Sequence, residues 1–374
     1  MKDKIYDCAI IGGGLAGLSL AILLSRKGYK VILFEKKKYP FHRVCGEYIS
    51  KESLGFLNHL GLATNQIDYA DINEVLISAP NGHHLLRPLS LGGIGISRYF
   101  LDNELYKIAE KNGAEIIQET SVEEVNLIQH KYHIKTINNT YVAKLAIACQ
   151  GKNSNLNKNL KRKSLGPKEN YVGIKYHIKT DFSDNRIELH NFAGGYAGIS
   201  KVENKTYCLC YLTKSKNLKR FNGNIKKMEE EILYQNPYLK NYFTNSEFLF
   251  KEPITVSQIT FSIKAPIVNQ MLVLGDSAGT IAPLCGNGMS LALHASALAE
   301  KNIEAYLKEE IDLKKLQEIH QQTWVNQFAF RIRFGALIQK LFGKTMLTNI
   351  SIQILKQFPS VVDYIIKKTH GKPF

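Results

Sequence analysis

The sequence predicts an α/β protein in which an antiparallel sheet is inserted into a three-layer domain built on a parallel sheet, followed by a helical C-terminal segment. Three observations predict this fold. A strand, a glycine turn, a helix and a second strand follow one another within residues 6–35. Apolar and polar residues alternate along 171–212, which is typical of antiparallel strands. An apolar strand at 271–274 runs into a second glycine turn, Gly275-Asp276.

The first unit has the order of elements that binds an adenine dinucleotide in a Rossmann-like domain. Residues 6–11 form an apolar strand that leads into the glycine turn 12–17. Gly12 allows the tight turn, Gly14 lets backbone amides approach a pyrophosphate, and Gly17 lets the following helix pack on the strands. The helix N-terminus offers partial positive charge to phosphates. Glu35, at the end of the second strand, can accept hydrogen bonds from a ribose hydroxyl.

The remaining elements are predicted in order along the chain. A compact loop with Arg43, Cys45 and Gly46 precedes a helix that ends near Leu60, and residues 73–90 form two strands around an Asn81-Gly82 turn. Further predicted elements are a helix at 99–111, strands at 115–118, 121–128, 132–137 and 141–148, an exposed connection at 152–169, a helix at 224–234, strand-like sequence to 261, and a long helix from 287 to about 307.

The second glycine turn decides the domain organisation. Two consecutive independent domains would not explain why Gly275-Asp276, so far along the chain, looks like a cofactor turn. The sequence therefore predicts a discontinuous dinucleotide-binding domain with an inserted substrate domain. The predicted ranges are 1–72, 98–166 and 262–308 for the first, 73–97 and 167–261 for the second, and 309–374 for a C-terminal helical segment.

Composition excludes several classes of protein. The chain has 49 Lys and Arg against 33 Asp and Glu, a net charge of +16, but no Arg-rich aromatic module or zinc spacing that would indicate nucleic-acid binding. The six cysteines are scattered, so neither a disulfide framework nor a metal site is expected. We find no signal peptide and no apolar stretch long enough to span a bilayer. We expect a cytoplasmic protein, free or peripheral on the inner face of a membrane; its oligomeric state stays open.

The C-terminal segment is both basic and apolar. From Arg331 to Phe374 there are eight Lys and Arg against a single acid, Asp363, and apolar residues lie between them. Two interpretations stay open. The helices could contact an anionic membrane surface, or they could cover the substrate domain and turn a lysine-rich face to solvent.

Two further motifs carry a resemblance to a known family. Arg98 with the following LDNELYKIA, and GDSAGTIAPLCGNGMSLALHASALA at 275–299, join the first glycine unit. Together they resemble the FAD-dependent monooxygenase and geranylgeranyl reductase superfamily, which has the GR2-type fold of the aromatic hydroxylases. The resemblance implies bound FAD, with the Asp276 carboxylate on a ribose or ribityl hydroxyl and the amides of the helix from Asn287 facing the flavin. The implied FAD-binding residues are Gly12, Gly14, Leu15, Ala16, Gly17, Glu35, Lys36, Arg43, Arg98, Val122, Gly275, Asp276, Pro283, Gly286, Asn287, Gly288 and Met289.

The electron donor is less well defined by the sequence. Where the family commonly has Asp-Gly after the strand ending at Ala148, this chain has Cys149-Gln150-Gly151. Gln150 carries no charge, and the chain has only one dinucleotide fingerprint. We therefore expect NAD(P)H to bind transiently, or another donor to reduce the flavin.

Three reactions are typical of the family, and each is expected to act on a hydrophobic small molecule such as an aromatic, polyketide or isoprenoid compound. Halogenation is least favoured, because the WxWxIP motif is missing and Trp324 is the only tryptophan. Cys45, in a loop similar to that of geranylgeranyl reductases, and Tyr196, on an aromatic-glycine strand, are the candidate catalytic residues. The reductases' YxWxFP motif is not reproduced. The sequence therefore favours a monooxygenase, leaves a double-bond reductase open, and keeps a flavin electron-transfer protein without its own substrate as a different class.

Overall fold

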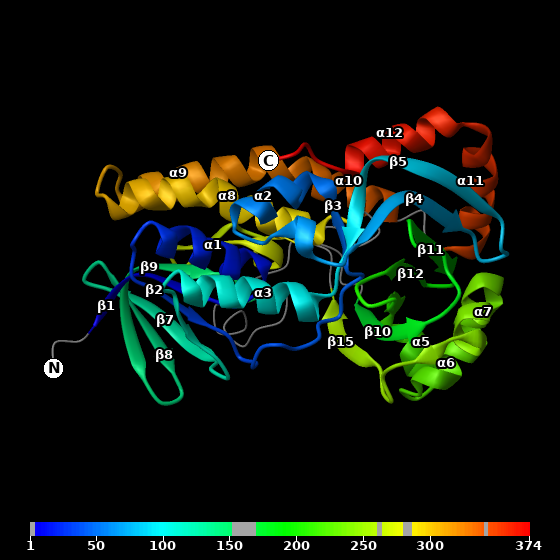
Figure 1. Ribbon diagram of the computed structural model, residues 1–374, viewed down its shortest axis with the longest axis horizontal. Helices are drawn as coiled ribbons and strands as arrows, with labels where there is room; N and C mark the ends of the chain where they lie inside the picture. Colours follow the sequence, from blue (N-terminus) through cyan, green and yellow to red (C-terminus); the bar gives the residue numbers. More distant parts are fainter. Residues whose placement is uncertain (1–3, 152–169, 260–263, 280–285, 340–342) are drawn as a thin grey trace.

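The computed structural model describes residues 4–151, 170–259, 264–279, 286–339 and 343–374. It has two sheets side by side, the first toward the left and the second toward the right of Figure 1. The predicted exposed connection at 152–169 and the predicted cofactor contact Pro283 lie outside the described residues.

The first sheet has a parallel centre. Its strand order is β16-β17-β9-β1-β2-β6, with β16 alone in this order antiparallel to its neighbour, and the hairpin β7–β8 joins through β9. The central strand β1 is buried along almost its whole length, which explains its near-continuous apolar sequence. The strands are β1 (Ile5–Ile11), β2 (Val31–Phe34), β6 (Glu115–Ile117), β7 (Val122–Ile128), β8 (Lys131–Thr136), β9 (Thr140–Ala148), β16 (Ile267–Val268) and β17 (Met271–Val273).

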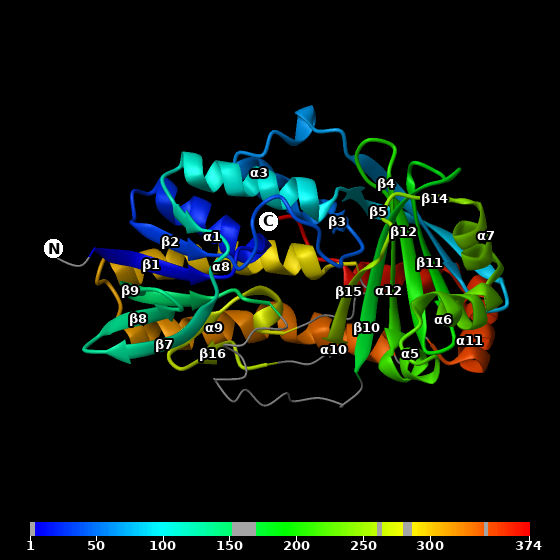
Figure 2. The same ribbon diagram turned by 90° about the horizontal axis from the view of Figure 1, so that it is seen from below.

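Helices cover this sheet. Helix α1 (Leu15–Arg26) contacts both α3 (Arg98–Lys111) and α8 (Gly288–Leu307), and α9 (Leu313–Trp324) packs along α8. Ser97 caps α3 by accepting a hydrogen bond from the Phe100 amide. Figure 2 looks onto this sheet, with β2, β1 and β9 side by side and α3 toward the β2 edge; Figure 1 shows α1, α8 and α9 together above the strands and the hairpin β7–β8 below. Short helical turns lie at Lys51–Ser53, Leu54–His59 (α2), Thr64–Gln66 and Gly275–Ser277.

The second sheet is mainly antiparallel, in the order β14-β10-β13-β12-β11-β4-β5-β3, with β15 paired to β10. The pair β11–β4 is parallel. The strands are β3 (Tyr48–Ser50), β4 (Ala70–Ser78), β5 (His84–Gly95), β10 (Tyr171–Lys179), β11 (Arg186–Phe192), β12 (Gly195–Lys201), β13 (Tyr207–Lys214), β14 (Glu247–Phe248) and β15 (Ile254–Ile259). Helices α5 (Ser215–Arg220), α6 (Ile225–Ile232) and α7 (Pro237–Asn245) follow β13 and cover one face.

The C-terminal helices join the two sheets. After α9, a wide turn at Val325–Ala329 leads into α10 (Phe330–Gln339). Helix α11 (Thr345–Gln357) contacts β5 and β11, and α12 (Pro359–Thr369) contacts β5. In Figure 1 these last two helices, drawn in red tones, lie over the second sheet.

The structure confirms the predicted fold class, because it combines a helix-covered parallel sheet with a separate antiparallel one. One predicted element is wrong. Residues 237–245, expected to be strand-like, form α7, which Asn236 caps with its side chain and Pro237 starts in the first turn. The predicted domain ranges stay a prediction; β3, from the first range, pairs with β5 in the second sheet. Among the described residues no helix is both long and apolar enough to span a bilayer.

Candidate active site

One cavity, of about 990 Å³, is lined by both sheets and by the C-terminal helices. The structure brings most of the predicted site residues to its wall. They are Gly12, Gly14, Leu15, Ala16, Glu35, Lys36, Arg43, Cys45, Arg98, Val122, Tyr196, Gly275, Asp276, Gly286, Gly288 and Met289. Gly17 and Asn287 do not line the cavity.

The glycine turn packs closely on one side and is open on the other. Gly12 has φ +109°, and a Cβ there would come within 2.5 Å of the Cys149 carbonyl oxygen. A Cβ on Gly17 would collide with the Gly12 carbonyl, so Gly17 permits contact between helix and strand rather than contact with a ligand. A Cβ on Gly14 would meet no atom within 4 Å. The open space at Gly14 is where a phosphate can approach the backbone.

Two helix N-termini meet this cavity. Helix α1 begins after Gly14 and α8 after Asn287, and no described side chain caps either one. Their first amides are therefore available to a ligand, and both helix dipoles favour negative charge there. Asn287 itself is fully buried and donates its side-chain amide to the Thr369 carbonyl, linking α8 to the end of α12. The prediction that it contacts a cofactor stays a prediction.

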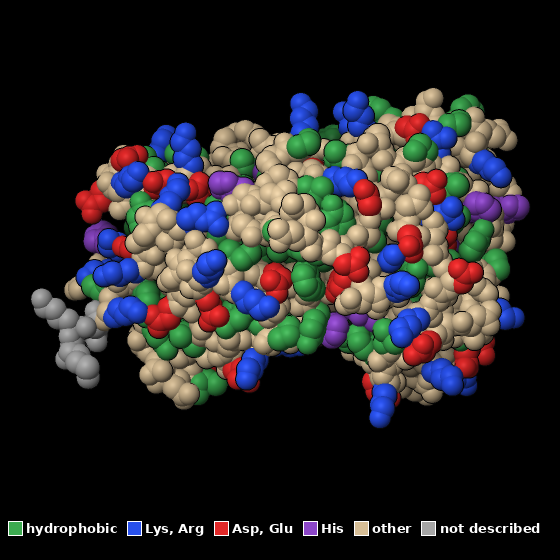
Figure 3. Space-filling model, in the orientation of Figure 1, with side chains coloured by type: hydrophobic (Ala, Val, Ile, Leu, Met, Phe, Trp, Pro, Cys, Tyr) green, Lys and Arg blue, Asp and Glu red, His purple; other side chains and the backbone are tan. Residues whose placement is uncertain are grey.

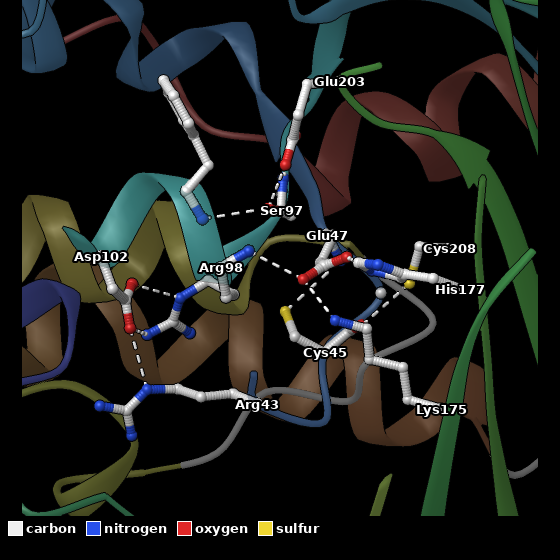
Figure 4. A network of polar contacts seen from close by, with 12 residues as sticks. Arg43, Cys45, Glu47, Ser97, Arg98, Asp102, Lys175, His177, Glu203 and Cys208 are labelled. Carbon is white, nitrogen blue, oxygen red and sulfur yellow. Dashed lines mark hydrogen bonds and ion pairs between the residues drawn. The ribbon is translucent and has the colours of Figure 1, made fainter. Parts of the chain in front are cut away.

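Arginine and carboxylate side chains form a network beside the glycine turn. The buried Asp102 carboxylate accepts hydrogen bonds from Arg98, at 2.6 and 2.8 Å, and from Arg43 at 2.9 Å. Arg43 also donates to Glu35 at 3.1 Å, and Glu35 accepts from the Gly13 amide at 3.0 Å. Figure 4 shows Asp102 between the two guanidinium groups. The network fixes the two cationic side chains at the cavity wall.

A second polar cluster, which the sequence did not predict, lies behind Cys45. Glu47 is fully buried; one carboxylate oxygen accepts from Lys175 and from the Arg98 amide, and the other lies 2.6 Å from His177 Nε2. Burial alone would raise the pKa of Glu47, but the Lys175 ammonium and the hydrogen bond with His177 lower it to about 2. The pKa of Lys175 is raised, because the attraction of Glu47 outweighs burial. Both charges therefore persist inside the protein.

This cluster holds the Cys45 loop against the sheet. The Glu47 amide lies 3.5 Å from Cys45 Sγ, and the Cys208 thiol donates to the Cys45 carbonyl at 3.3 Å. Figure 4 shows Cys45 between Arg98 on one side and Lys175 on the other. Ligand atoms of Glu47, His177 and Cys208 lie within 4.8 Å of one another. A metal ion there would compete with the Lys175 ammonium already bound to Glu47, so we interpret the group as an ion-pair cluster.

Strand register explains why these residues share one wall. In β10, β13 and β12 the partners Lys175–Cys210–Gly198 and Gly173–Leu212–Tyr196 lie side by side. Alternate residues of a strand face the same side, so Lys175 and His177 share the face of Gly173, which lines the cavity. The only signal in the sequence was a pair of basic residues, two positions apart, in a strand with largely apolar neighbours.

The far part of the cavity is apolar and is built by elements distant in sequence. Side chains of β4, β5 and β11 meet those of α11 and α12 in two small hydrophobic clusters. The aliphatic members that line the cavity are Val75, Ile77, Leu85, Leu89, Ile187, Leu189, Ile352, Leu355, Val362 and Ile366. The cavity therefore has a polar, glycine-lined part and an apolar arm.

Several curated proteins are similar to the chain. Conditioned medium factor receptor 1 of Dictyostelium discoideum is 24% identical, over 96% of this chain and 73% of that protein. A digeranylgeranylglycerophospholipid reductase of Methanosarcina acetivorans is 26% identical, over 91% of this chain and 86% of that protein. The FAD-dependent monooxygenase atnA of an Arthrinium species is 22% identical, over 96% of this chain and 54% of that protein.

Solved structures share the fold. The flavin-dependent brominase Bmp2 superposes with a TM-score of 0.79 at 18% identity, covering 98% of this chain and 93% of that one. A geranylgeranyl bacteriochlorophyll reductase-like protein of Thermoplasma acidophilum superposes with a TM-score of 0.77 at 17% identity, covering 99% and 97%.

The cavity wall fits FAD. Two uncapped helix N-termini, open space at Gly14 and fixed arginines suit a pyrophosphate and an electron-rich ring. A family model described as an FAD binding domain matches residues 6–323, most of the chain. The chain therefore belongs to the FAD binding domain family and is an FAD-dependent oxidoreductase.

Proposed function

We propose that the protein reduces carbon–carbon double bonds of a long, apolar, isoprenoid-type chain. The observation that carries this proposal is the apolar arm, which continues from the glycine-lined part of the same cavity. A compact aromatic substrate would leave much of such an arm unfilled, whereas an extended hydrocarbon chain can bury its surface along it. The similarity to a digeranylgeranylglycerophospholipid reductase over 91% of the chain supports the same substrate class.

In this proposal the chain's own residues bind and orient the reactants. The backbone amides at the start of α1 and α8, together with Arg43 and Arg98, would bind the cofactor. The carboxylates of Glu35 and Asp276 would accept hydrogen bonds from its hydroxyl groups. Reduced FAD, when bound, supplies a hydride to one carbon of the double bond. Cys45, whose thiol faces the cavity, donates the proton to the other carbon and is reprotonated from solvent. One hydride and one proton thus add two hydrogen atoms across the double bond.

The Glu47 cluster positions Cys45 for this step. Because Glu47 binds Lys175 and His177 on β10 and the Arg98 amide on α3, it fixes the loop against both halves of the molecule. Tyr196 and Leu212 are neighbours on the sheet wall and would contact the hydrocarbon chain. NAD(P)H, bound transiently, or another donor would reduce the cofactor between turnovers.

An anaerobic stopped-flow experiment tests the reaction. FAD-loaded protein is reduced chemically and mixed with geranylgeraniol or with its fully saturated analogue, and flavin absorbance is followed. We expect reoxidation only with the alkene, and a saturated product by mass spectrometry. Reoxidation by neither compound contradicts the proposal and leaves a monooxygenase or an electron-transfer protein, which oxygen uptake with the substrate then distinguishes.

A monooxygenase is the second candidate, favoured by the similarity to the monooxygenase atnA. It predicts the opposite oxygen dependence: oxygen uptake coupled to substrate, with an oxygenated product and no anaerobic turnover.

The apolar arm can be tested separately. Leu355→Trp, on the cavity side of α11, should raise KM for a geranylgeranyl substrate about tenfold or more and leave a short prenyl substrate less affected. Gln353→Trp, on the exposed side of the same helix, is the matched control and should leave KM unchanged.

A further inference from the structure

Helix α11 is apolar on two opposite sides. Thr348, Ile352 and Leu355 face the second sheet or the cavity, as expected for a helix that covers a core. The other side carries exposed Met346, Leu347, Ile350 and Ile354, at the i, i+4 spacing of a continuous stripe. A helix with a second apolar side needs a second apolar environment besides the core that it covers.

Helix α12 extends this exposed stripe. Phe358, just before it, and Val361 and Tyr364 within it are between 47% and 58% exposed. Seven of the sixteen large exposed apolar side chains in the described part of the chain thus fall between residues 346 and 364. Scattered exposed apolar residues are normal, but a cluster of this kind indicates a surface that binds something.

The charge around this patch is positive. Lys344, Lys356, Lys367 and Lys368 are exposed, and Lys368 lies over the Tyr364 ring at 5.4 Å. The single acid, Asp363, is already paired with Arg87 at 2.6 Å. Figure 3 shows hydrophobic and basic side chains, with a few acidic ones among them, at the upper right edge, where Figure 1 places α11 and α12.

We propose that this face, the exposed side of α11 and α12, docks on an anionic lipid bilayer. The apolar stripe would enter the headgroup boundary, and the four lysines would bind lipid phosphates. Charge complementarity selects an anionic bilayer over a second copy of this chain, which would bring the same four lysines against each other. The proposal does not depend on which reaction the site performs.

The surface also lies directly behind the apolar arm. Ile352, Leu355, Val362 and Ile366 line the cavity from the opposite side of the same two helices. A bilayer against the outer side is therefore separated from the apolar arm by one layer of helices. A lipophilic substrate in the bilayer would therefore lie close to the apolar arm.

Vesicle flotation of the full-length, FAD-loaded protein tests the proposal. At low salt we expect binding to vesicles of equimolar phosphatidylcholine and phosphatidylglycerol, and none to phosphatidylcholine alone. Lys356→Glu/Lys367→Glu/Lys368→Glu should weaken binding on the order of 100-fold. The matched control, Lys30→Glu/Lys111→Glu/Lys131→Glu, makes the same change of charge at exposed lysines of the first domain and should weaken it far less.

The apolar stripe has its own variant and control. Leu347→Ser/Ile350→Ser/Ile354→Ser should release the protein from vesicles, whereas Ile128→Ser/Ile137→Ser, at exposed positions on β7 and after β8, should not. FAD content and thermal unfolding establish that each variant is folded. If a serine variant does not fold, the two lysine triple variants alone test the proposal. Three results would each overturn the proposal. The wild-type protein could fail to bind anionic vesicles, or both lysine triple variants could weaken vesicle binding equally. The wild-type protein could also be a dimer that the serine triple variant dissociates.

Discussion

Two buried clusters, each built on a glutamate and a histidine, lie on opposite faces of the second sheet. Glu47 with Lys175 and His177 borders the cavity, whereas Glu188 with His190 lies on the face covered by α7. The alternation of side chains along β11 separates the two clusters. Ile187 and Leu189 line the cavity, so the alternate residues Glu188 and His190 face the opposite side of the sheet.

The Glu188–His190 cluster, called here the sealed cluster, is also joined by polar contacts. His190 lies 2.8 Å from Ser78 Oγ and 2.9 Å from a Glu188 oxygen, and Tyr242 of α7 donates to Glu188 at 2.8 Å. Serine, histidine and glutamate in contact have the residue types of a hydrolytic triad, yet none of the three lines the cavity. A buried titratable group therefore matters for chemistry only where the fold opens a path to it.

The largest expected effect is that of Glu47→Gln. It leaves the Lys175 ammonium buried without a counter-charge, which should lower the free energy of unfolding by about 3–5 kcal/mol. Turnover per bound FAD should also fall, because the Cys45 loop loses its anchor. Urea unfolding and single-turnover kinetics check both.

The double variant Glu47→Gln/Lys175→Met is the control, since it removes both charges and should recover much of the stability. If turnover per bound FAD stays at the wild-type level in both variants, the cluster is structural only.

The next effect is a pH dependence of opposite sign on the two faces. Burial raises the pKa of Glu229, under α6, to about 7, although Tyr176 and Tyr211 donate hydrogen bonds to it. Its folded pKa lies above the unfolded value of 4.5, so stability is lost as pH rises through 4.5–7. The folded pKa of Glu47 lies below 4.5, so its contribution is lost as pH falls from 4.5 toward 2.

Glu229→Gln should therefore be more stable, relative to wild type, at pH 8 than at pH 5, by about 3 kcal/mol. Unfolding curves at both pH values measure this. Glu230→Gln removes the same charge from the exposed neighbouring position and should show no such difference. An identical pH response of the two variants would contradict the assignment.

A smaller effect is expected for Glu188→Gln in the sealed cluster. Loss of the contact between the Glu188 carboxylate and His190 should cost about 1–3 kcal/mol of stability, with turnover per bound FAD unchanged. Glu74→Gln, which removes the partly exposed partner of Arg186 on the neighbouring strand, is the control and should cost less than about 1 kcal/mol. A turnover defect in Glu188→Gln would show that the two faces communicate.

The smallest effect is that of Tyr242→Phe, which removes one buried hydrogen bond to Glu188 and should cost about 1 kcal/mol. Tyr238→Phe removes an exposed hydrogen bond to His84 from the same helix and should cost less. Thermal unfolding compares the two; equal shifts would mean that burial of the hydroxyl contributes nothing.

The sequence could predict the cofactor end of the cavity because its requirements are local. Gly12, Gly14 and the start of α8 are recognisable from a turn and the helix that follows it, and the structure brings them to one wall. The Glu47 cluster could not be predicted, because Glu47 and Lys175 are 128 residues apart and meet only when the second sheet acquires its register. The apolar arm likewise depends on α11 reaching β5.

Helix α7 was missed for a different reason. Its aromatic residues are typical of strands, and they indeed lie in a strand-rich region. The capping pair Asn236-Pro237 was the competing local signal, and it decided the outcome because Asn236 also donates three buried hydrogen bonds to neighbouring strands.

The discontinuity of the first sheet has a consequence for the order of assembly during synthesis. Strand β1 is made early, but β9 pairs with it from residue 140 onward and β17 reaches β9 only after the whole second sheet has been made. Contacts between such distant segments form slowly. The glycine turn at 12–17 must wait for α8, some 270 residues later, before the cavity wall is complete. We therefore expect the cofactor to be captured late, by a chain whose second sheet is already folded.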